Sequence, residues 1–194
     1  MRSSSRSRST TCPSSSRRPS STADQAVSDS GDQSSGPTGS RLSHIDSAGA
    51  ARMVDVGAKA RTNRRAVAGG TFRTTAEVIS LLADNQLPKG DVLATARIAG
   101  IMAAKRTDEL IPLCHQLALS SVDVDFAVGD DHIDVTATVT TSGQTGVEME
   151  ALTAVAVTGL TLHDMVKAVD RRASMHDIRL LEKTGGKSGS WRRE

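Results

Sequence analysis

A regular alternation of apolar and polar residues between positions 121 and 141 constrains the fold more than any other feature of this sequence. It comes in two runs separated by Gly129-Asp130-Asp131, a combination typical of a turn. Side chains two apart share one face of a strand, so the runs predict an antiparallel hairpin with one buried and one solvated face. The alternating apolar positions are Val122, Val124, Phe126 and Val128, then Ile133, Val135, Ala137 and Val139.

The buried face of that hairpin needs a cover, and the flanking sequence supplies helices. Residues 74–110 have apolar side chains at helical spacing on both sides of a break at Pro88-Lys89-Gly90, which predicts two helices. Thr75 or its neighbour Thr74 is suited to cap the first helix, and Asp91 stands where a carboxylate favours the start of the second.

Three more segments complete the pattern. Helical spacing continues over residues 148–172, and strands are expected at 67–73 and 176–186. The order is then strand, helices, hairpin, helix and strand. This order predicts an α+β fold in which the helices pack on one face of an antiparallel sheet.

The first 40 residues cannot contribute to such a core. They include fifteen serines and scarcely an apolar side chain, so we expect residues 1–40 to be a disordered Ser/Arg-rich extension and residues 41–194 to form one domain. The extension has five arginines and three aspartates, which accounts for the whole net charge of +2. The folded part is therefore expected to be neutral overall.

Composition also excludes some partners. A neutral domain with no tyrosine, two phenylalanines and one tryptophan offers neither a broad cationic surface nor stacking platforms, so no nucleic acid is expected to bind. No apolar run approaches the length of a membrane span, so no membrane partner is expected. Cys12 and Cys114 lie in different parts of the chain, which argues against a disulfide framework and for a cytoplasmic location.

Cys114 and His115 stand side by side in the otherwise apolar stretch "LIPLCHQLAL". Adjacent residues rarely reach one metal ion, and no CxxC or HxxxH spacing occurs, so a metal site is poorly supported. A nucleophile with its base, a buried thiol beside a hydrogen-bonded histidine and the wall of a ligand pocket all remain open.

Three charged residues near helix ends are candidates for proton transfer or anion binding. Asp164 and Lys167 are three apart and share one helix face, where each can tune the proton affinity of the other. Lys89, just before a predicted helix start, suits an anion or a proton transfer. The commoner explanation for Asp164 and Lys167 is a solvated ion pair, and for Lys89 it is a lysine in an exposed turn. Glu150 falls on nearly the same face as Asp164 but about 20 Å earlier along the helix.

The segment "TGGKSG" is similar to a phosphate-binding loop, but position 181 is leucine where that motif needs glycine. Without that glycine, the segment is predicted only to be a cationic stretch near the C-terminus.

Long blocks of the chain are more informative than these short motifs. The blocks "KGDVLATARIAGIMAAKRTDELIPLCHQL", "TGVEMEALTAVAVTGLTLHDMVKAVD" and "RLLEKTGGKSG" closely resemble the molybdenum cofactor biosynthesis protein C family. The resemblance covers about residues 42–189. It implies a ferredoxin-like fold, hexamers that are trimers of dimers with sites at dimer interfaces, and no metal or organic cofactor.

The resemblance also implies an activity. Members are cyclic pyranopterin monophosphate synthases, lyases that rearrange a cyclic dihydroguanosine triphosphate and release diphosphate. The competing interpretation is a non-catalytic nucleotide- or pterin-binding protein on the same fold.

Residue roles follow from the matched positions. The resemblance implies that Asp164, Lys89 and Lys167 are catalytic. It implies substrate contacts for Leu113, Cys114 and His115 and for Met149 and Glu150, which makes "LIPLCHQL" a ligand wall rather than a metal site. A triphosphate needs several cations, and the candidates are Arg64, Arg65, Arg106, Lys183 and Lys187.

Overall fold

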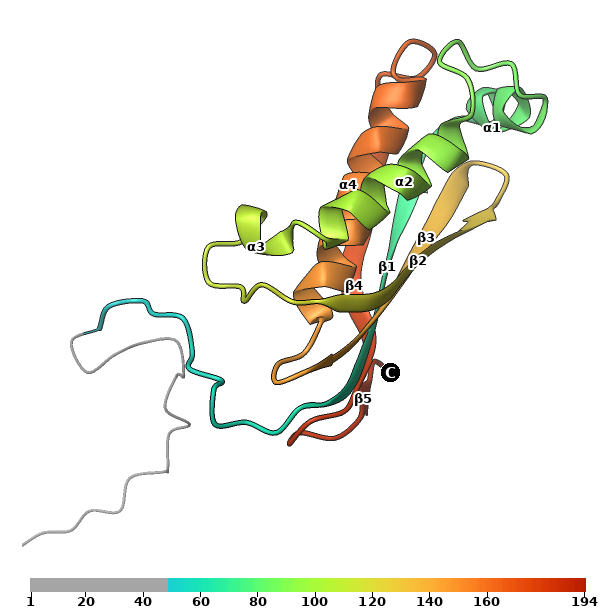
Figure 1. Ribbon diagram of the computed structural model, residues 1–194. Coiled ribbons are helices and arrows are strands. Elements are labelled where there is room, and N and C mark those ends of the chain that lie inside the picture. Colours follow the sequence, from blue (N-terminus) through green and yellow to red (C-terminus); the bar gives the residue numbers. More distant parts are fainter. Residues whose placement is uncertain (1–48) are drawn as a thin grey trace, which may run out of the picture. The chain divides into compact units, whose positions relative to one another are not determined.

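The alternating segments lie side by side in one antiparallel sheet of the computed structural model, which describes residues 49–194 (Figure 1). The expected extension at residues 1–40 lies outside the described residues. Within them the sheet has five strands in the order β2-β3-β1-β4-β5. The strands are β1 (Thr62–Arg73), β2 (Leu119–Val128), β3 (His132–Gly143), β4 (Ser174–Thr184) and β5 (Trp191–Arg192).

The predicted hairpin is confirmed as the pair β2–β3. Val124 lies opposite Ala137 and Phe126 opposite Val135, so apolar residues meet across the strands. The turn closes with a hydrogen bond from the Gly129 N–H to the His132 carbonyl, 2.9 Å. Along β3 the residues facing the helices are buried and the alternate ones are not, as a sheet with one solvated face requires.

Helices cover one face of this sheet, as predicted (Figure 1). Thr75 caps α1 by accepting a hydrogen bond from the Val78 N–H, and Asp91 caps α2 by accepting one from the Ala94 N–H. Both side chains satisfy a backbone donor that the helix itself cannot. The helices are α1 (Ala76–Ala83), α2 (Val92–Ala104), α3 (Thr107–Leu110) and α4 (Glu148–Val166).

Small residues let α2 and α4 pack closely. A Cβ placed on Gly100 of α2 would collide with the Thr158 hydroxyl and approach the Ala154 carbonyl of α4 to 3.0 Å. Ala96 of α2 is fully buried, and its carbonyl accepts a hydrogen bond from Thr158. This contact leaves no room for a ligand between the two helices at this point.

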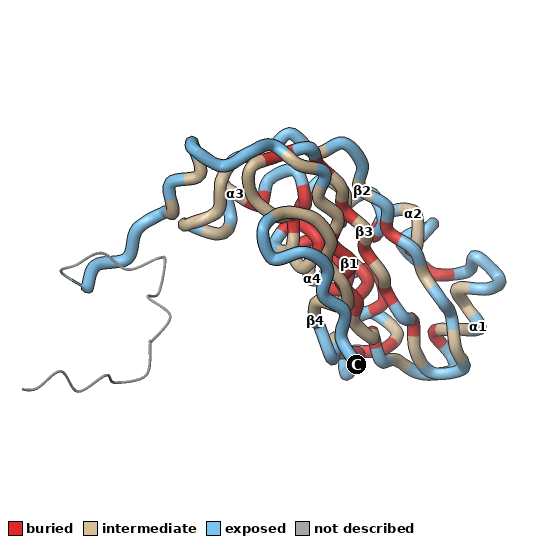
Figure 2. Tube along the Cα trace, turned by 90° about the horizontal axis from the view of Figure 1, so that it is seen from below, coloured by how far each residue is buried: buried red, intermediate tan, exposed pale blue. Residues whose placement is uncertain are grey.

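The core lies between α4 and the central strands, where buried residues concentrate along β1, β3 and α4 (Figure 2). Phe72, Ile133, Val155 and Leu162 are fully buried there. Burying such side chains is the main stabilising contribution to a domain of this size. None of the described helices is long and apolar enough to cross a membrane.

Several element boundaries differ from the expectation, and the last strand runs over Ser174–Thr184 rather than 176–186. The first strand begins at Thr62 rather than at residue 67, because its pairing with β3 extends through the polar residues 62–65. The last helix ends at Val166 rather than at residue 172, because a turn follows that hydrogen bonds back to Val166. The short elements α3 and β5 were not predicted, since four and two residues are too few to show a periodicity.

Candidate active site

The three predicted catalytic residues meet at the C-terminal end of α4. Asp164 lies in the last turn of this helix and Lys167 follows its last residue, while Lys89 comes from the turn before α2. The Lys89 ammonium donates to Asp164 Oδ2 at 2.6 Å, and the Lys167 ammonium donates to Oδ1 at 2.7 Å. One carboxylate thus holds two lysines, each on its own oxygen. We call this group the lysine cluster.

The two lysines determine the protonation state of Asp164 in this cluster. The hydrogen bonds from Lys167 and then from Lys89 lower the pKa of Asp164 to about 2. Asp164 is therefore ionised throughout the working pH range. Its side chain is 55% exposed, so the cluster can be reached by a ligand.

The position of Lys89 is fixed by a tight turn. Leu87 is buried, and the Gly90 N–H donates to its carbonyl at 3.1 Å. Gly90 has φ of +83°, a conformation that glycine adopts without a steric cost. The buried leucine thereby anchors the segment from which Lys89 reaches Asp164.

The five predicted substrate contacts meet elsewhere, at the N-terminal end of α4. Leu113, Cys114 and His115 line a cavity of about 310 Å³ together with Met149 and Glu150. His115 Nε2 lies 2.7 Å from the carbonyl of Val54. Because a carbonyl only accepts, Nε2 carries a hydrogen, and the bond orients the imidazole. The predicted ligand wall therefore exists as a set of neighbouring side chains, called the pocket below.

Burial sets the protonation state of the acidic groups in the pocket. Glu150 is only 4% exposed, and this desolvation raises its pKa to about 7, with a further contribution from Glu148. Burial, followed by the charge of Glu150, also raises the pKa of the Cys114 thiol. Cys114 thus stays protonated near neutrality, which argues against a nucleophilic cysteine. Glu150, in contrast, can exchange a proton near neutral pH.

A larger cavity adjoins the pocket and is rich in cations. Its volume is about 680 Å³, and it shares Lys59, Thr145, Gly146 and Glu148 with the pocket. Three of the five candidate cations line it, Arg64, Lys183 and Lys187. We call it the basic cavity. Neither Arg65 nor Arg106 is among the described residues that line it, and Arg65 instead pairs with Glu182 at 2.6 Å.

Two residues that line the basic cavity each have a buried polar atom without a hydrogen-bond partner. Within residues 49–194, the buried side-chain atoms without a hydrogen bond are Thr62 Oγ1 and Arg64 Nε, and both residues line this cavity. Leaving buried polar groups unpaired is unfavourable unless a ligand or solvent satisfies them. The cations that line the cavity, rather than these two buried atoms, suit it to an anionic ligand with several oxygen acceptors.

Lys59 belongs to this cavity, although no motif in the sequence distinguished it. The Gln144 side chain donates hydrogen bonds of 3.0 Å to the carbonyls of Gly57 and Lys59 and so holds their loop in place. Only the fold brings this loop beside β4, far away in the sequence. Lys59 could not be distinguished beforehand from other lysines in turns.

The two groups of predicted residues do not meet within one chain. Glu150 is in the first turn of α4 and Asp164 in the last, about 20 Å apart at the helical rise. No group of three histidine, cysteine, aspartate or glutamate residues in the described part of the chain is arranged to hold a metal ion.

Comparisons with known proteins show the family to which the matched residues belong. The model of the MoaC family matches residues 53–186, which include both groups. The cyclic pyranopterin monophosphate synthase 2 of Mycobacterium bovis is 63% identical over 152 residues, 78% of this chain and 91% of that protein. The cyclic pyranopterin monophosphate synthase of Streptomyces avermitilis is 59% identical over 157 residues, 81% of this chain and 92% of its own length. The synthase of Chloroflexus aurantiacus is 57% identical over 154 residues, 78% of this chain and 94% of its own. This chain belongs to the MoaC family.

Proposed function

We propose that this chain is a cyclic pyranopterin monophosphate synthase of molybdenum cofactor biosynthesis. It converts (8S)-3′,8-cyclo-7,8-dihydroguanosine 5′-triphosphate to cyclic pyranopterin monophosphate and releases diphosphate. The observation that carries the proposal is family membership at 63% identity together with the lysine cluster, in which one carboxylate holds two lysines. The reaction releases diphosphate by cleavage rather than hydrolysis, so we assign a lyase.

The lysine cluster suits the proton transfers of this reaction. Opening the ring and rearranging its carbon skeleton require protons to be added to and removed from nitrogen and oxygen. Lys89 and Lys167 act as the general acids and bases, and Asp164 holds them in position and stabilises their positive charge. In the last step a substrate hydroxyl attacks the α-phosphorus. A new O–P bond forms, the bond to the bridging oxygen breaks, and diphosphate leaves with that electron pair.

The pocket and the basic cavity suit the two halves of the substrate. The pocket combines Leu113 and Met149 with the polar groups of His115 and Glu150, which can hydrogen bond a purine-derived ring. The basic cavity has four cations, Lys59, Arg64, Lys183 and Lys187, against the carboxylate of Glu148, which pairs with Lys183 at 2.9 Å. We therefore assign the triphosphate to the basic cavity.

A second copy of the chain would complete this site. The outward surfaces of α2 and α4 carry exposed apolar side chains, with Ile98 at 58%, Met102 at 48% and Leu160 at 69% exposure. A twofold axis near the middle of α4 would cover this apolar surface and set two α4 helices antiparallel. The lysine cluster of each chain would then face the pocket of its partner. We propose such dimers, assembled three at a time into a homohexamer.

Three finer assignments complete the proposal. The strand order β2-β3-β1-β4 with helices on one face supports a ferredoxin-like fold. The family match at residues 53–186 supports a synthase domain at 41–194, with residues 1–40 as an extension outside it. The separation of Cys12 from Cys114 in the sequence supports a cytoplasmic location.

Turnover of the cyclic triphosphate distinguishes the enzyme from the alternative, a protein that binds nucleotides or pterins without reaction. The purified protein should release one diphosphate and form one cyclic pyranopterin monophosphate for each substrate consumed. Diphosphate can be measured by a coupled assay and the pterin by its absorbance after oxidation. Tight binding of the substrate without either product would instead establish the non-catalytic interpretation.

A further inference from the structure

Asp170 is a buried carboxylate that the proposed reaction does not use. It lies three residues after Lys167 and is only 8% exposed. Its Oδ2 accepts a hydrogen bond of 3.0 Å from the Thr74 hydroxyl, and its Oδ1 accepts one of 2.8 Å from the Arg172 N–H. Buried carboxylates are rare unless their oxygens are satisfied in this way. The Thr74–Asp170 bond joins two segments that are 96 residues apart in the sequence.

One of these segments carries Lys167. After α4 the chain turns back, and the Asp170 N–H donates to the Val166 carbonyl at 3.0 Å. His163 closes the same turn, since its Nδ1 lies 2.9 Å from the carbonyl of Ala173. Lys167 is the first residue of this turn and Asp164 the residue after His163. The turn that Asp170 anchors therefore determines where both side chains lie.

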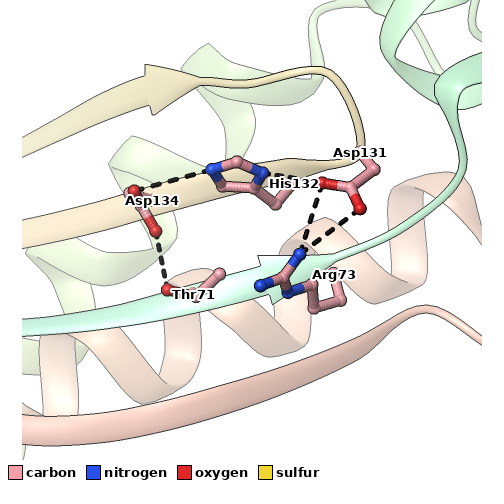
Figure 3. Close-up of polar contacts among 5 residues, drawn as sticks. All are labelled: Thr71, Arg73, Asp131, His132 and Asp134. Atoms are coloured by element: carbon pink, nitrogen blue, oxygen red, sulfur yellow. Dashed lines mark hydrogen bonds and ion pairs between the residues drawn. The ribbon is translucent and has the colours of Figure 1, made fainter.

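The other segment leads to Lys89. Thr74 follows the last residue of β1 and precedes the cap of α1, and the chain from α1 runs directly into the turn that carries Lys89. Thr74 itself is held by the hairpin turn, because its N–H donates to the Asp131 carbonyl at 2.9 Å. Arg73 pairs with both carboxylate oxygens of Asp131 at 3.3 Å (Figure 3). The Thr74 hydroxyl thus projects from a fixed backbone.

We propose that Thr74 and Asp170 are positioning residues for the lysine cluster. Their hydrogen bond fixes the segment that delivers Lys89 relative to the turn that delivers Lys167. Asp164 can then hold both lysines at once, at 2.6 and 2.7 Å. The inference rests on the proposed function, because it assumes that the lysine cluster carries out the chemistry. Neither Thr74 nor Asp170 lines the pocket or the basic cavity, so their effect is expected on turnover rather than on substrate binding.

The test removes the hydroxyl without changing the size of the side chain. Thr74→Val should lower kcat by about tenfold to a hundredfold, since small displacements of catalytic groups have effects of this size. KM should stay within about twofold. Thr74→Ser keeps the hydroxyl and should restore kcat to nearly the wild-type value. Thr74 is only partly buried, so Thr74→Ala provides a second variant without the hydroxyl. All four proteins are compared as full chains, well below their unfolding temperatures.

A double-variant cycle separates positioning from general stability. If Thr74 acts through the cluster, adding Thr74→Val to the already disabled Lys167→Ala should lower kcat no further. Lys167→Arg is assayed alongside. If Lys167→Arg turns over normally, the assignment of the cluster to catalysis is wrong. If Lys167→Arg is inactive while Thr74→Val and Thr74→Ala match Thr74→Ser, the cluster is catalytic and the positioning role is overturned.

Discussion

The two ends of α4 carry two carboxylates whose environments are opposite. Asp164 at the C-terminal end is exposed and holds two lysines, so its pKa falls to about 2. Glu150 at the N-terminal end is buried, and this desolvation raises its pKa to about 7. One helix thus presents a permanent anion at one end and a group that can be neutral at the other. Sites that keep two carboxyl groups in different states in this way are suited to acid–base chemistry.

The two ends of α4 also differ in the cavities beside them. The end with the lysine cluster has charges and proton carriers but does not line a large cavity, whereas the other end has two adjoining cavities with a volume suited to a nucleotide. The proposed reaction uses groups from both ends, and the rise of α4 separates these groups by about 20 Å within one chain. Association of two antiparallel copies is the simplest way to bring unlike ends together.

The largest effect is expected at the lysine cluster. Lys89→Arg or Lys167→Arg should lower single-turnover rates by at least about a thousandfold with little change in substrate affinity, because a guanidinium keeps its proton across the working pH range. Asp164→Asn should behave likewise, since it leaves both ammonium groups without their counter-charge. Rapid-quench kinetics measures the single-turnover rate of each variant, and equilibrium binding measures its affinity for the substrate. Near-normal rates in both arginine variants would mean that the lysines only hold phosphate.

The next prediction tests whether the two ends of α4 cooperate between chains. Asp164→Ala and His115→Ala should each be nearly inactive alone. After unfolding and joint refolding at equal concentrations, random pairing should restore about one quarter of wild-type activity, because half of the dimers are mixed and each has one intact site of two. Mass spectrometry of the intact oligomers verifies mixing. Mixed oligomers without recovered activity would place both ends in one site of a single chain, or in unrelated sites.

A pH dependence of stability is expected from Glu150. Its folded pKa of about 7 lies above the ordinary 4.5, so the folded state holds the proton more tightly than the unfolded state does. The favourable difference is present below pH 4.5 and is lost as the pH rises through 7. Between pH 5 and pH 8 the free energy of unfolding should fall by up to about 3 kcal/mol more in wild type than in Glu150→Gln.

Denaturant titrations at one fixed protein concentration measure this difference, with Glu148→Gln as a matched control in the same helical turn. Parallel pH profiles for wild type and Glu150→Gln would show that Glu150 is ionised in the folded protein.

Neighbouring arginines on β1 allow a matched test of the basic cavity. Arg64 lines this cavity, whereas Arg65 pairs with Glu182 and does not. Arg64→Ala should raise KM by about tenfold, the usual effect of losing one charge-assisted contact to phosphate, and change kcat less. Arg65→Ala should leave KM within about twofold. Steady-state kinetics decides, and equal effects of the two substitutions would remove the triphosphate from this cavity.

The smallest effect is expected from the N-terminal extension. Deleting residues 1–40 should leave turnover and oligomeric state nearly unchanged, because this segment has too few apolar residues to join a core. Size-exclusion chromatography with light scattering, together with the diphosphate assay, checks both. A marked loss of either would mean that the extension takes part in turnover or in assembly.

The periodic segments were predictable because their patterns reflect local geometry. The alternation around Gly129 predicted the hairpin, and Thr75 and Asp91 predicted the helix starts, since a cap depends on residues within one turn. The spacing of Asp164 and Lys167 predicted their contact for the same reason. The polar residues at the start of β1 and the end of α4 were less informative, because their conformation depends on partners distant in the sequence.

The sequence by itself thus determined the α+β class, the order of the main elements and the local pairing of Asp164 with Lys167. The tertiary structure decided that Lys89 reaches the same carboxylate, that Lys59 joins Arg64 and Lys183 around one cavity, and that Glu150 is buried. These contacts join residues separated by tens of positions in the chain. Burial, which raises the pKa of Glu150, depends on everything packed around a side chain, so neighbouring residues in the sequence cannot reveal it.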